Sequence, residues 1–352
     1  MPSSYADVLG TNCKKGYSLI SSKIGAATTE SDEQGLFDRI RSACAEVARR
    51  ASSVRIDESE LSRFAARLAI EPWSDEGLDP ARDLEGSEVE KLAFVVALDA
   101  INFGSGWFPF LRKRKGMSGY RTIAAACRER FESEGAWSGE ALRAITPESM
   151  ANLLGQERRD PDVYELMQLY AQAWCDLGKW LEQEYDDCFE TFVAAAGGSA
   201  ERMVLSLAKM PLYRDVSSYR GISVPFYKRA QITAADLHHA LGSSPLGQFD
   251  DLDQLTLFAD NLVPHVLRCE GVLRYERELT DKIDREEMLE AGSACEVEIR
   301  AVAVEAVERI IRELRGHGRR MTAHELDGML WNGGQAPRIK GRPRHRTRTS
   351  YY

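Results

Sequence analysis

The spacing of apolar residues constrains the fold of this chain more than any other feature. Leu36, Ile40 and Cys44 recur at intervals of four, which places them on one face of a helix. A helical spacing also occurs around Leu237 and at 61–68, 92–98, 166–181, 203–207, 263–267 and 302–314. Alternation typical of strands is brief, at 54–56 and 221–224. The sequence therefore predicts an all-α fold: a single compact helical domain with few short strands.

The same pattern sets the boundaries of that domain. Residues 1–35 contain Ser, Thr, Gly and Lys without a sustained period, so we predict a loosely ordered N-terminal extension. Residues 36–352 are predicted to form the folded domain, because its glycine-rich breaks are short loops and not linkers. Within it, the pair Thr146-Pro147 predicts a helix that begins at Pro147 with Thr146 as its N-cap.

Composition and charge narrow the classes of partner. Of the 352 residues, 43% are hydrophobic, and the formal net charge is -9. An acidic chain opposes generic nucleic-acid binding, which needs a basic face against the phosphates, and it favours a small-molecule substrate. The chain shows no signal-peptide pattern and no apolar run long enough to cross a membrane, and its seven cysteines include no CxxC pair. We expect a cytoplasmic monomer with free thiols.

A first polar segment interrupts the helical pattern at 99–108. Asn102 and Phe103 lead into a glycine-rich turn, which ends on Trp107 and Phe108. Aromatic rings beside flexible backbone can form a slot in which a flat base stacks. A turn that only lines the core would use the same residues, so both interpretations stay open here.

A second polar segment begins at Phe226 and Tyr227. Lys228 and Gln231 are three residues apart, and Asp236 is eight beyond Lys228, so a continuous helix would place all three near one face. Such a face can be a clamp for a phosphate or a sugar. It can equally be an ordinary pattern of surface salt bridges.

The third polar segment contains Asp260, which follows Phe258-Ala259 and precedes a helix with Pro264 in its first turn. An aspartate at this place is often an N-cap. It could instead face a cationic transition state, an arrangement that resembles the catalytic aspartate of helix-hairpin-helix DNA glycosylases. The glycines of the hairpin are missing from this chain.

The C-terminal segment is strongly basic and ends on Tyr351 and Tyr352. Its basic residues are Arg338, Lys340, Arg342, Arg344, His345, Arg346 and Arg348. A tail of this kind is commonly disordered or touches polyanions. The two terminal aromatic residues favour another interpretation, in which the tail 338–352 is a cationic flap that closes on the site and grips a phosphate.

Other motifs give no support to a metal or an organic cofactor. His238 and His239 are adjacent, so they point in different directions around a helix. The run 250–253 lacks the glycine and the distant glutamate of a calcium loop. No Walker A, GxGxxG, HExxH or GxSxG pattern occurs. We predict neither a metal nor a cofactor.

Taken together, the polar segments give the chain a resemblance to a known family that extends from about residue 54 to 352. The motifs that carry it are Asn102-Phe103, Trp107-Phe108, Ser118-Gly119-Tyr120, Tyr213-Arg214-Asp215, the run 226–231 with Asp236, the run 255–260 with Pro264, the run 296–300, Leu330-Trp331, and His345-Arg346 and Arg348 with Tyr351-Tyr352. In this order they resemble the queuosine salvage proteins, the queuosine 5′-phosphate N-glycosylase/hydrolases. Two departures are Asn261-Leu262, where members carry Tyr-Arg, and Gly106 ahead of the aromatic pair.

The resemblance implies a helical fold related to DNA glycosylases and a hydrolase that releases queuine from queuosine 5′-monophosphate. Asp260 would be the catalytic carboxylate. The residues implied to bind the substrate are Asn102, Phe103, Trp107, Phe108, Tyr227, Lys228, Gln231, Asp236, Phe258, His345, Arg346 and Arg348. Among these, the three aromatic residues at 103–108 would bound the base, and Lys228 with the tail cations would hold the phosphate.

Three other classes of protein remain as alternatives. A non-catalytic helical protein that binds a modified nucleotide would use the same aromatic slot and basic tail, and only Asp260 separates it from the hydrolase. A nucleic-acid glycosylase acting on a flipped base is opposed by the net charge of -9. A plain helical interaction protein would leave the polar set of Asn102, Lys228 and Asp260 without a role.

Overall fold

The computed structural model describes residues 34–70, 84–242 and 244–352. Almost all of the extension predicted at 1–35, with Cys13, therefore lies outside the described residues. The helices are α3 (Leu36–Arg50), α4 (Glu58–Ile70), α5 (Glu88–Ala100), α6 (Gly119–Glu134), α7 (Gly139–Arg143), α8 (Pro147–Leu153), α9 (Pro161–Tyr185), α10 (Phe189–Ala195), α11 (Ala200–Leu207), α12 (Lys228–Leu241), α13 (Val263–Cys269), α14 (Arg277–Asp284), α15 (Ala294–Gly316), α16 (Ala323–Gly333) and α17 (Pro337–Lys340), with 3-10 turns η1 (Pro211–Tyr213), η2 (Pro245–Gly247) and η3 (Leu252–Gln254).

The helical prediction is confirmed. Every segment with helical spacing lies in one of these helices. Their ends also follow local sequence signals, because α8 begins at Pro147 with the Thr146 side chain accepting a hydrogen bond from Ser149 N. The prediction at this helix start is therefore confirmed as well.

Two small antiparallel pairs complete the described secondary structure. Strand β1 (Val54–Ile56) pairs with β4 (Leu273–Tyr275), and β2 (Val216–Tyr219) forms a hairpin with β3 (Ile222–Pro225). The segments at 54–56 and 221–224 correspond to β1 and β3, whereas the sequence did not predict β2 and β4. Arg220 and Gly221 connect the hairpin with φ angles of 46° and 82°, the left-handed pair that a tight two-residue turn requires.

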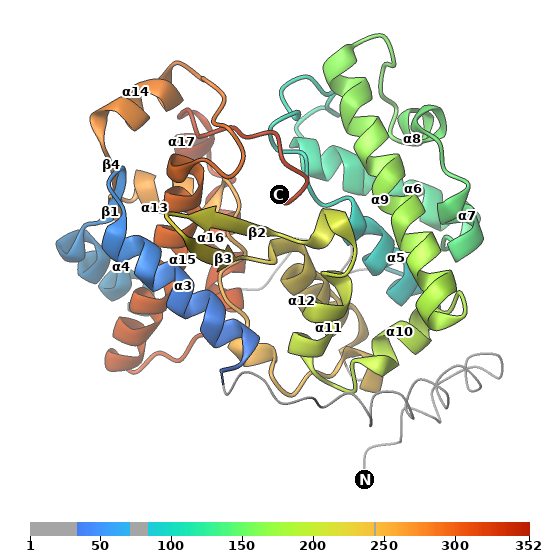
Figure 1. The fold of residues 1–352 in the computed structure, drawn as a ribbon, viewed down its shortest axis with the longest axis horizontal. Helices are drawn as coiled ribbons and strands as arrows, with labels where there is room; N and C mark the ends of the chain where they lie inside the picture. Colours follow the sequence, from blue (N-terminus) through green and yellow to red (C-terminus); the bar gives the residue numbers. More distant parts are fainter. Residues whose placement is uncertain (1–33, 71–83, 243) are drawn as a thin grey trace.

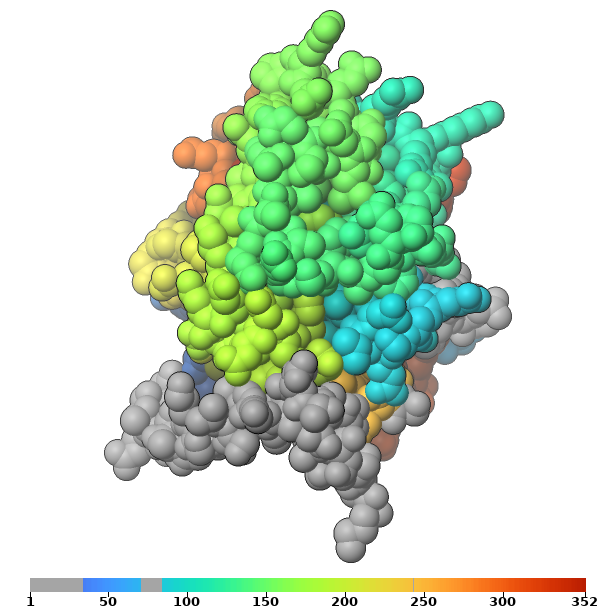
Figure 2. Space-filling model, turned by 90° about the vertical axis from the view of Figure 1, so that its right-hand side faces the viewer, coloured from blue at the N-terminus to red at the C-terminus, as the bar shows by residue number. Residues whose placement is uncertain are grey.

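The helices form two groups with the C-terminal segment between them (Figure 1). In one group, α15 packs against α3 and α4, and in the other α9 packs against α7 and α8, while α12 packs against α5. Seen from the side in Figure 2, the green residues of α9 and its neighbours cover one flank of the molecule. Apolar side chains from both groups join in one connected core. The segment after α17 thus runs where the two groups meet.

A buried ion pair connects α15 to the loops beside that segment. Arg300, on α15, donates from Nη1 to Asp215 Oδ1 at 3.0 Å and from Nη2 to Asp215 Oδ2 at 2.6 Å. Both side chains are almost fully buried, with 1% and 2% of their surface exposed. Burial by itself lowers the pKa of Arg300, but Asp215 and Glu296 together raise it more, so the guanidinium stays charged.

This pair also fixes the backbone on either side of it. Arg300 Nε donates to Ala259 O at 2.9 Å, and Lys228 N donates to Asp215 Oδ2 at 3.2 Å. The Arg300 guanidinium lies 4.8 Å from the centre of the Tyr352 ring, whose hydroxyl donates to Glu296. One ionic cluster therefore holds the start of α12, the loop before α13 and the C-terminal segment.

Two expectations concerned the state of the cysteines and the membrane. Cys44, Cys127, Cys175, Cys269 and Cys295 are free thiols, as expected for them, and Cys13 lies outside the described residues. Among the described helices, none combines the length and the apolar character that crossing a membrane requires.

We expect Asp215→Ala to lower the free energy of unfolding by about 3–5 kcal/mol, because it leaves the buried Arg300 without its bidentate partner. The matched control is Asp281→Ala, which removes an exposed pair with Arg277 and should cost less than about 1 kcal/mol. Urea denaturation followed by circular dichroism measures both. Similar small losses in the two variants would show that the buried pair does not organise the fold.

Candidate active site

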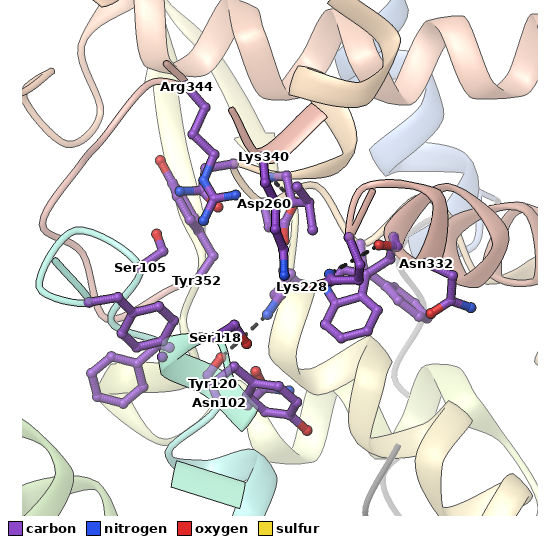
Figure 3. A pocket seen from close by; sticks show the side chains of 18 of the residues that line it. Asn102, Ser105, Ser118, Tyr120, Lys228, Asp260, Asn332, Lys340, Arg344 and Tyr352 are labelled. Atoms are coloured by element: carbon purple, nitrogen blue, oxygen red, sulfur yellow. Dashed lines mark hydrogen bonds between the residues drawn. The ribbon is translucent and has the colours of Figure 1, made fainter. Parts of the chain in front are cut away.

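A cavity of about 660 Å³ lies where the two helix groups and the C-terminal segment meet. Its size is typical of pockets for small molecules. Its lining includes the turn after α5, the start of α6, one face of α12, the loop before α13, α16 and the segment after α17. Figure 3 shows Lys228 and Asp260 in this pocket, with Asn102 beside Lys228. The walls of the pocket therefore come from segments that are far apart in the sequence, between residues 102 and 352.

Asp260 is held by the backbone of the helix that follows it. Its Oδ1 accepts hydrogen bonds from Leu262 N at 2.7 Å and from Val263 N at 3.0 Å, just before α13, whose first turn contains Pro264. No hydrogen bond from the described residues reaches Oδ2. The two interpretations of this aspartate are thus compatible, because one oxygen binds the helix start and the other is available to a ligand in the pocket.

Lys228 is buried at the start of α12 and reaches the same pocket. The residue before it, Tyr227, has a left-handed backbone with φ of 48°, which turns the chain into the helix. The ammonium of Lys228 donates to Asn102 O at 3.3 Å, and only 6% of the residue is exposed. Burial lowers the pKa of Lys228, and the carboxylate of Asp260 opposes that shift. A buried cation is thereby placed close to the candidate carboxylate.

A second carboxyl group, Asp327 on α16, lies close to Asp260. Its Oδ1 accepts a hydrogen bond from Phe258 N at 3.1 Å, and only 7% of the residue is exposed. Burial, and then repulsion by the Asp260 carboxylate, raise the pKa of Asp327 well above its usual range. Asp327 was not among the residues predicted from the sequence, where its neighbours Leu326 and Leu330-Trp331 mark it only as a polar residue in an apolar stretch.

Aromatic rings form part of the pocket wall. Phe103, Phe108 and Phe258, all predicted to bind substrate, line it, and so do Tyr120 and Trp331, which meet edge to face with centroids 6.3 Å apart. The structure places Trp107 elsewhere, and its indole donates to Glu165 at 2.7 Å. A flat ring system could pack against this set of rings.

The other predicted residues divide between the lining and the layer behind it. Asp236 and Arg346 line the pocket, and Arg346 pairs with Glu286 at 2.6 Å. Gln231 is fully buried behind the lining, where its amide nitrogen donates to Phe226 O and to Thr256. Tyr227 is not among the lining residues either.

Two basic residues of the C-terminal segment that were predicted to bind the substrate, His345 and Arg348, do not line the pocket. His345 is buried beside Tyr352, and burial, with Arg344 and Arg300 nearby, lowers its pKa to about 3, so its ring is neutral. Arg348 pairs with Asp162 and with Glu165 on α9. These contacts attach the segment to the two helix groups.

The C-terminal segment is packed into the fold and forms one wall of the pocket. Gly104 N donates to Tyr352 O at 3.0 Å, and Leu289 N donates to Arg346 O at 2.8 Å. Gly106 lies directly against the backbone of Thr347, with no room for a side chain. Residues 340–344, Arg346 and Tyr352 then complete the lining.

The charge of the pocket differs from that of the chain. Six lysines and arginines line it against four carboxylates, although the chain carries a net charge of -9. Within the described ranges, no cluster of three histidine, cysteine, aspartate or glutamate residues could hold a metal ion. An anionic organic ligand suits such a lining.

The fold and the pocket together define a helical protein with a partly open pocket whose aromatic and cationic lining suits a small, flat, anionic molecule. The chain belongs to the queuosine salvage protein family, whose model matches residues 83–352. A Sphaerobacter thermophilus protein named queuosine 5′-phosphate N-glycosylase/hydrolase is 37% identical over 319 residues, which cover 87% of this chain and 95% of the relative. Relatives of the same name from Bos taurus and Dictyostelium discoideum are 31% and 30% identical and are covered over 96% and 90% of their lengths.

The contact between Gly106 and the C-terminal segment yields a prediction about the pocket wall. Gly106→Ala would place a methyl group against Thr347 O, so we expect the segment to be displaced and stability to fall by about 1–3 kcal/mol. Limited proteolysis with mass spectrometry should then show faster cleavage within 338–352. Gly316→Ala is the control, because a methyl group there meets open space. Unchanged protection in Gly106→Ala would contradict the role of this contact.

Proposed function

We propose that this protein hydrolyses the N-glycosidic bond of queuosine 5′-monophosphate and releases queuine for salvage into tRNA modification. The observation that carries the proposal is Asp260, a carboxylate with one oxygen fixed by backbone amides and the other available inside a pocket of nucleotide size. The names of the relatives support the same reaction, since each describes a queuosine 5′-phosphate N-glycosylase/hydrolase.

The chemistry of the substrate explains why a fixed carboxylate matters. Queuine is a 7-deazaguanine, so the ring position that purine hydrolases commonly protonate is a carbon atom and cannot accept a proton usefully. More of the barrier must therefore be lowered at the sugar, where a carboxylate stabilises the developing oxocarbenium ion. Asp260 has this role in the proposal. The hydrogen bonds from the amides at the start of α13 already fix its position, so the carboxylate does not have to move when the transition state forms.

The base leaves more easily when a neighbouring group donates a hydrogen bond or a proton to it, and Asp327 is suited to this role. Burial and the Asp260 carboxylate raise its pKa and so favour the protonated form, which in the proposal donates a hydrogen bond or a proton to the base. In the proposal the two carboxyl groups have different roles, because Asp260 faces the sugar and Asp327 faces the base.

The remaining predicted residues have positioning or binding roles. In the proposal, Phe103, Phe108 and Phe258 bound the base, while Asn102 and Asp236 donate or accept hydrogen bonds at the base or the ribose. Trp107, Tyr227 and Gln231 act from behind the lining through the residues they hold. The proposal retains the relation to helix-hairpin-helix glycosylases, which the position of Asp260 ahead of α13 supports, as well as a cytoplasmic monomer acting on the free nucleotide.

The role of Asp260 is tested by Asp260→Asn. An amide oxygen can still accept the bonds from Leu262 N and Val263 N, so we expect near-normal stability and retained binding of the nucleotide. The single-turnover rate of queuine release should fall about 100-fold or more, because the neutral side chain cannot stabilise the oxocarbenium ion. Chromatography of released queuine, together with melting curves with and without ligand, measures both properties.

Asp251→Asn is the matched control for this experiment. Asp251 also accepts bonds from helix-start amides, those of Ala200 and Glu201, but it lies away from the pocket. It should therefore retain wild-type activity. If Asp260→Asn cleaves within a few-fold of wild type, Asp260 is only a cap and the protein's catalytic carboxylate lies elsewhere.

The role of Asp327 is tested by the pH dependence of kcat/KM. An acid that must be protonated gives activity at low pH that declines as the pH rises through its raised pKa. We expect this alkaline decline in the wild type and its absence in Asp327→Asn, at an activity at least about tenfold lower. An identical pH profile in the two proteins would remove Asp327 from proton donation and leave it a role in binding the base.

A further inference from the structure

Arg229, the second residue of α12, is a buried cation that lies outside the pocket lining. Only 2% of the residue is exposed. Among the described residues, its guanidinium donates to backbone carbonyls and to no carboxylate: Nη1 donates to Ala100 O at 2.6 Å and to Asp99 O at 3.3 Å, and Nη2 donates to Leu212 O. An apolar residue of similar size would avoid the cost of burying this charge, so packing alone does not account for an arginine here.

Two of the carbonyls that Arg229 binds belong to the last turn of α5. The C-terminal end of a helix carries a partial negative charge, and the last turn of α5 contains no basic residue of its own. Arg229 supplies that cation from α12. The adjacent Lys228 donates to Asn102 O at 3.3 Å. Two neighbouring side chains of α12 thus fix the backbone on both sides of Ile101, where α5 ends and the pocket wall begins.

The same guanidinium packs against the ring of Phe103, which lines the pocket. Arg229 Cζ lies 4.8 Å from the centre of that ring and 4.3 Å from the centre of the Tyr213 ring. The ring of Tyr170, on α9, also meets Phe103 edge to face with centroids 4.9 Å apart, and the Tyr170 hydroxyl donates to Phe103 O at 2.6 Å. Contacts from two helices therefore determine where the Phe103 ring lies.

The chemistry of arginine suits both kinds of contact at once. Its guanidinium directs N–H groups outward in one plane, while the faces of that plane can pack on aromatic rings. A lysine ammonium has no such faces, and it loses its proton readily when it is buried. Arg229 can therefore bind the end of α5 and pack on Phe103 together.

We propose that Arg229 is a positioning residue for the base: it holds the Phe103 ring in the pocket wall and thereby sets the affinity for queuine without touching it. This inference rests on the proposed function, in which Phe103 bounds the base. Because the base contacts Phe103 both before and during cleavage, a displaced ring weakens binding more than it slows the reaction.

The variant Arg229→Lys tests the proposal on the two products of the reaction. The dissociation constants of queuine and of ribose 5-phosphate are measured by titration calorimetry with the full-length protein. The matched control is Arg130→Lys. Arg130 Cζ lies 4.6 Å from the centre of the Trp137 ring and its guanidinium donates to Gly135 O, so it makes the same kinds of contact away from the pocket.

The expected result is a loss confined to the base. Arg229→Lys should weaken queuine binding about 5- to 10-fold and ribose 5-phosphate binding less than about twofold, because only the base packs against Phe103. For queuosine 5′-monophosphate, KM should rise about 5- to 10-fold while kcat changes less than about threefold. Arg130→Lys should bind both products as the wild type does. Equal losses for the two products, or unchanged binding of queuine, would overturn the proposal.

A fluorine NMR signal from the ring itself requires no ligand. With 4-fluorophenylalanine in place of Phe103, Arg229→Lys should shift or broaden the resonance, and Arg130→Lys should leave it unchanged. An unchanged resonance in Arg229→Lys would refute the positioning role. If Arg229→Lys does not fold, Arg229→Gln takes its place with the same expected results, because it buries no ammonium. A wild type that binds no queuine would refute the proposed function, while the fluorine spectrum still decides whether Arg229 positions Phe103.

Discussion

The pocket depends on the buried ion pair between Arg300 and Asp215. Its two side chains do not line the cavity, yet each holds the backbone next to one of the charged lining residues, Asp215 at Lys228 and Arg300 at Ala259 beside Asp260. The separation of that cation from that carboxylate is therefore set by an interaction in the core. Because a bidentate pair fixes direction as well as distance, small movements of the surrounding helices change the pocket little.

Much of the fold could be predicted from the sequence, because helix periodicity is a local property. The stripe at Leu36, Ile40 and Cys44 and the Thr146 cap correspond directly to α3 and α8. The strands β2 and β4 could not be found in this way. They are three or four residues long, and each exists because a partner strand lies beside it, which no window of sequence contains.

The residues of the candidate site also fall into those with a local sequence signal and those that depend on distant contacts. Asp260 and Lys228 stand in local contexts that predicted a helix start and a helix face, and both line the pocket. Asp327 was missed because its significance comes from Phe258 and Asp260, far away in the sequence. Arg348 shows the opposite case. The basic composition of the tail predicted that it binds phosphate, but it forms ion pairs with Asp162 and Glu165 on α9.

The position of the C-terminal segment has a consequence for how the protein folds. The contacts of Tyr352 with Gly104 and Glu296, and of Arg348 with Glu165, join parts of the chain that are widely separated in sequence. Closing such long loops is entropically unfavourable, and the chain's end can dock only once the helices on both sides of it are in place, so we expect these contacts to form late. Most of the helical core can therefore assemble before the pocket acquires its last wall. Partly folded chains would have a native-like helix content but no ability to hold a nucleotide, which makes ligand binding a sensitive reporter of the final folding step.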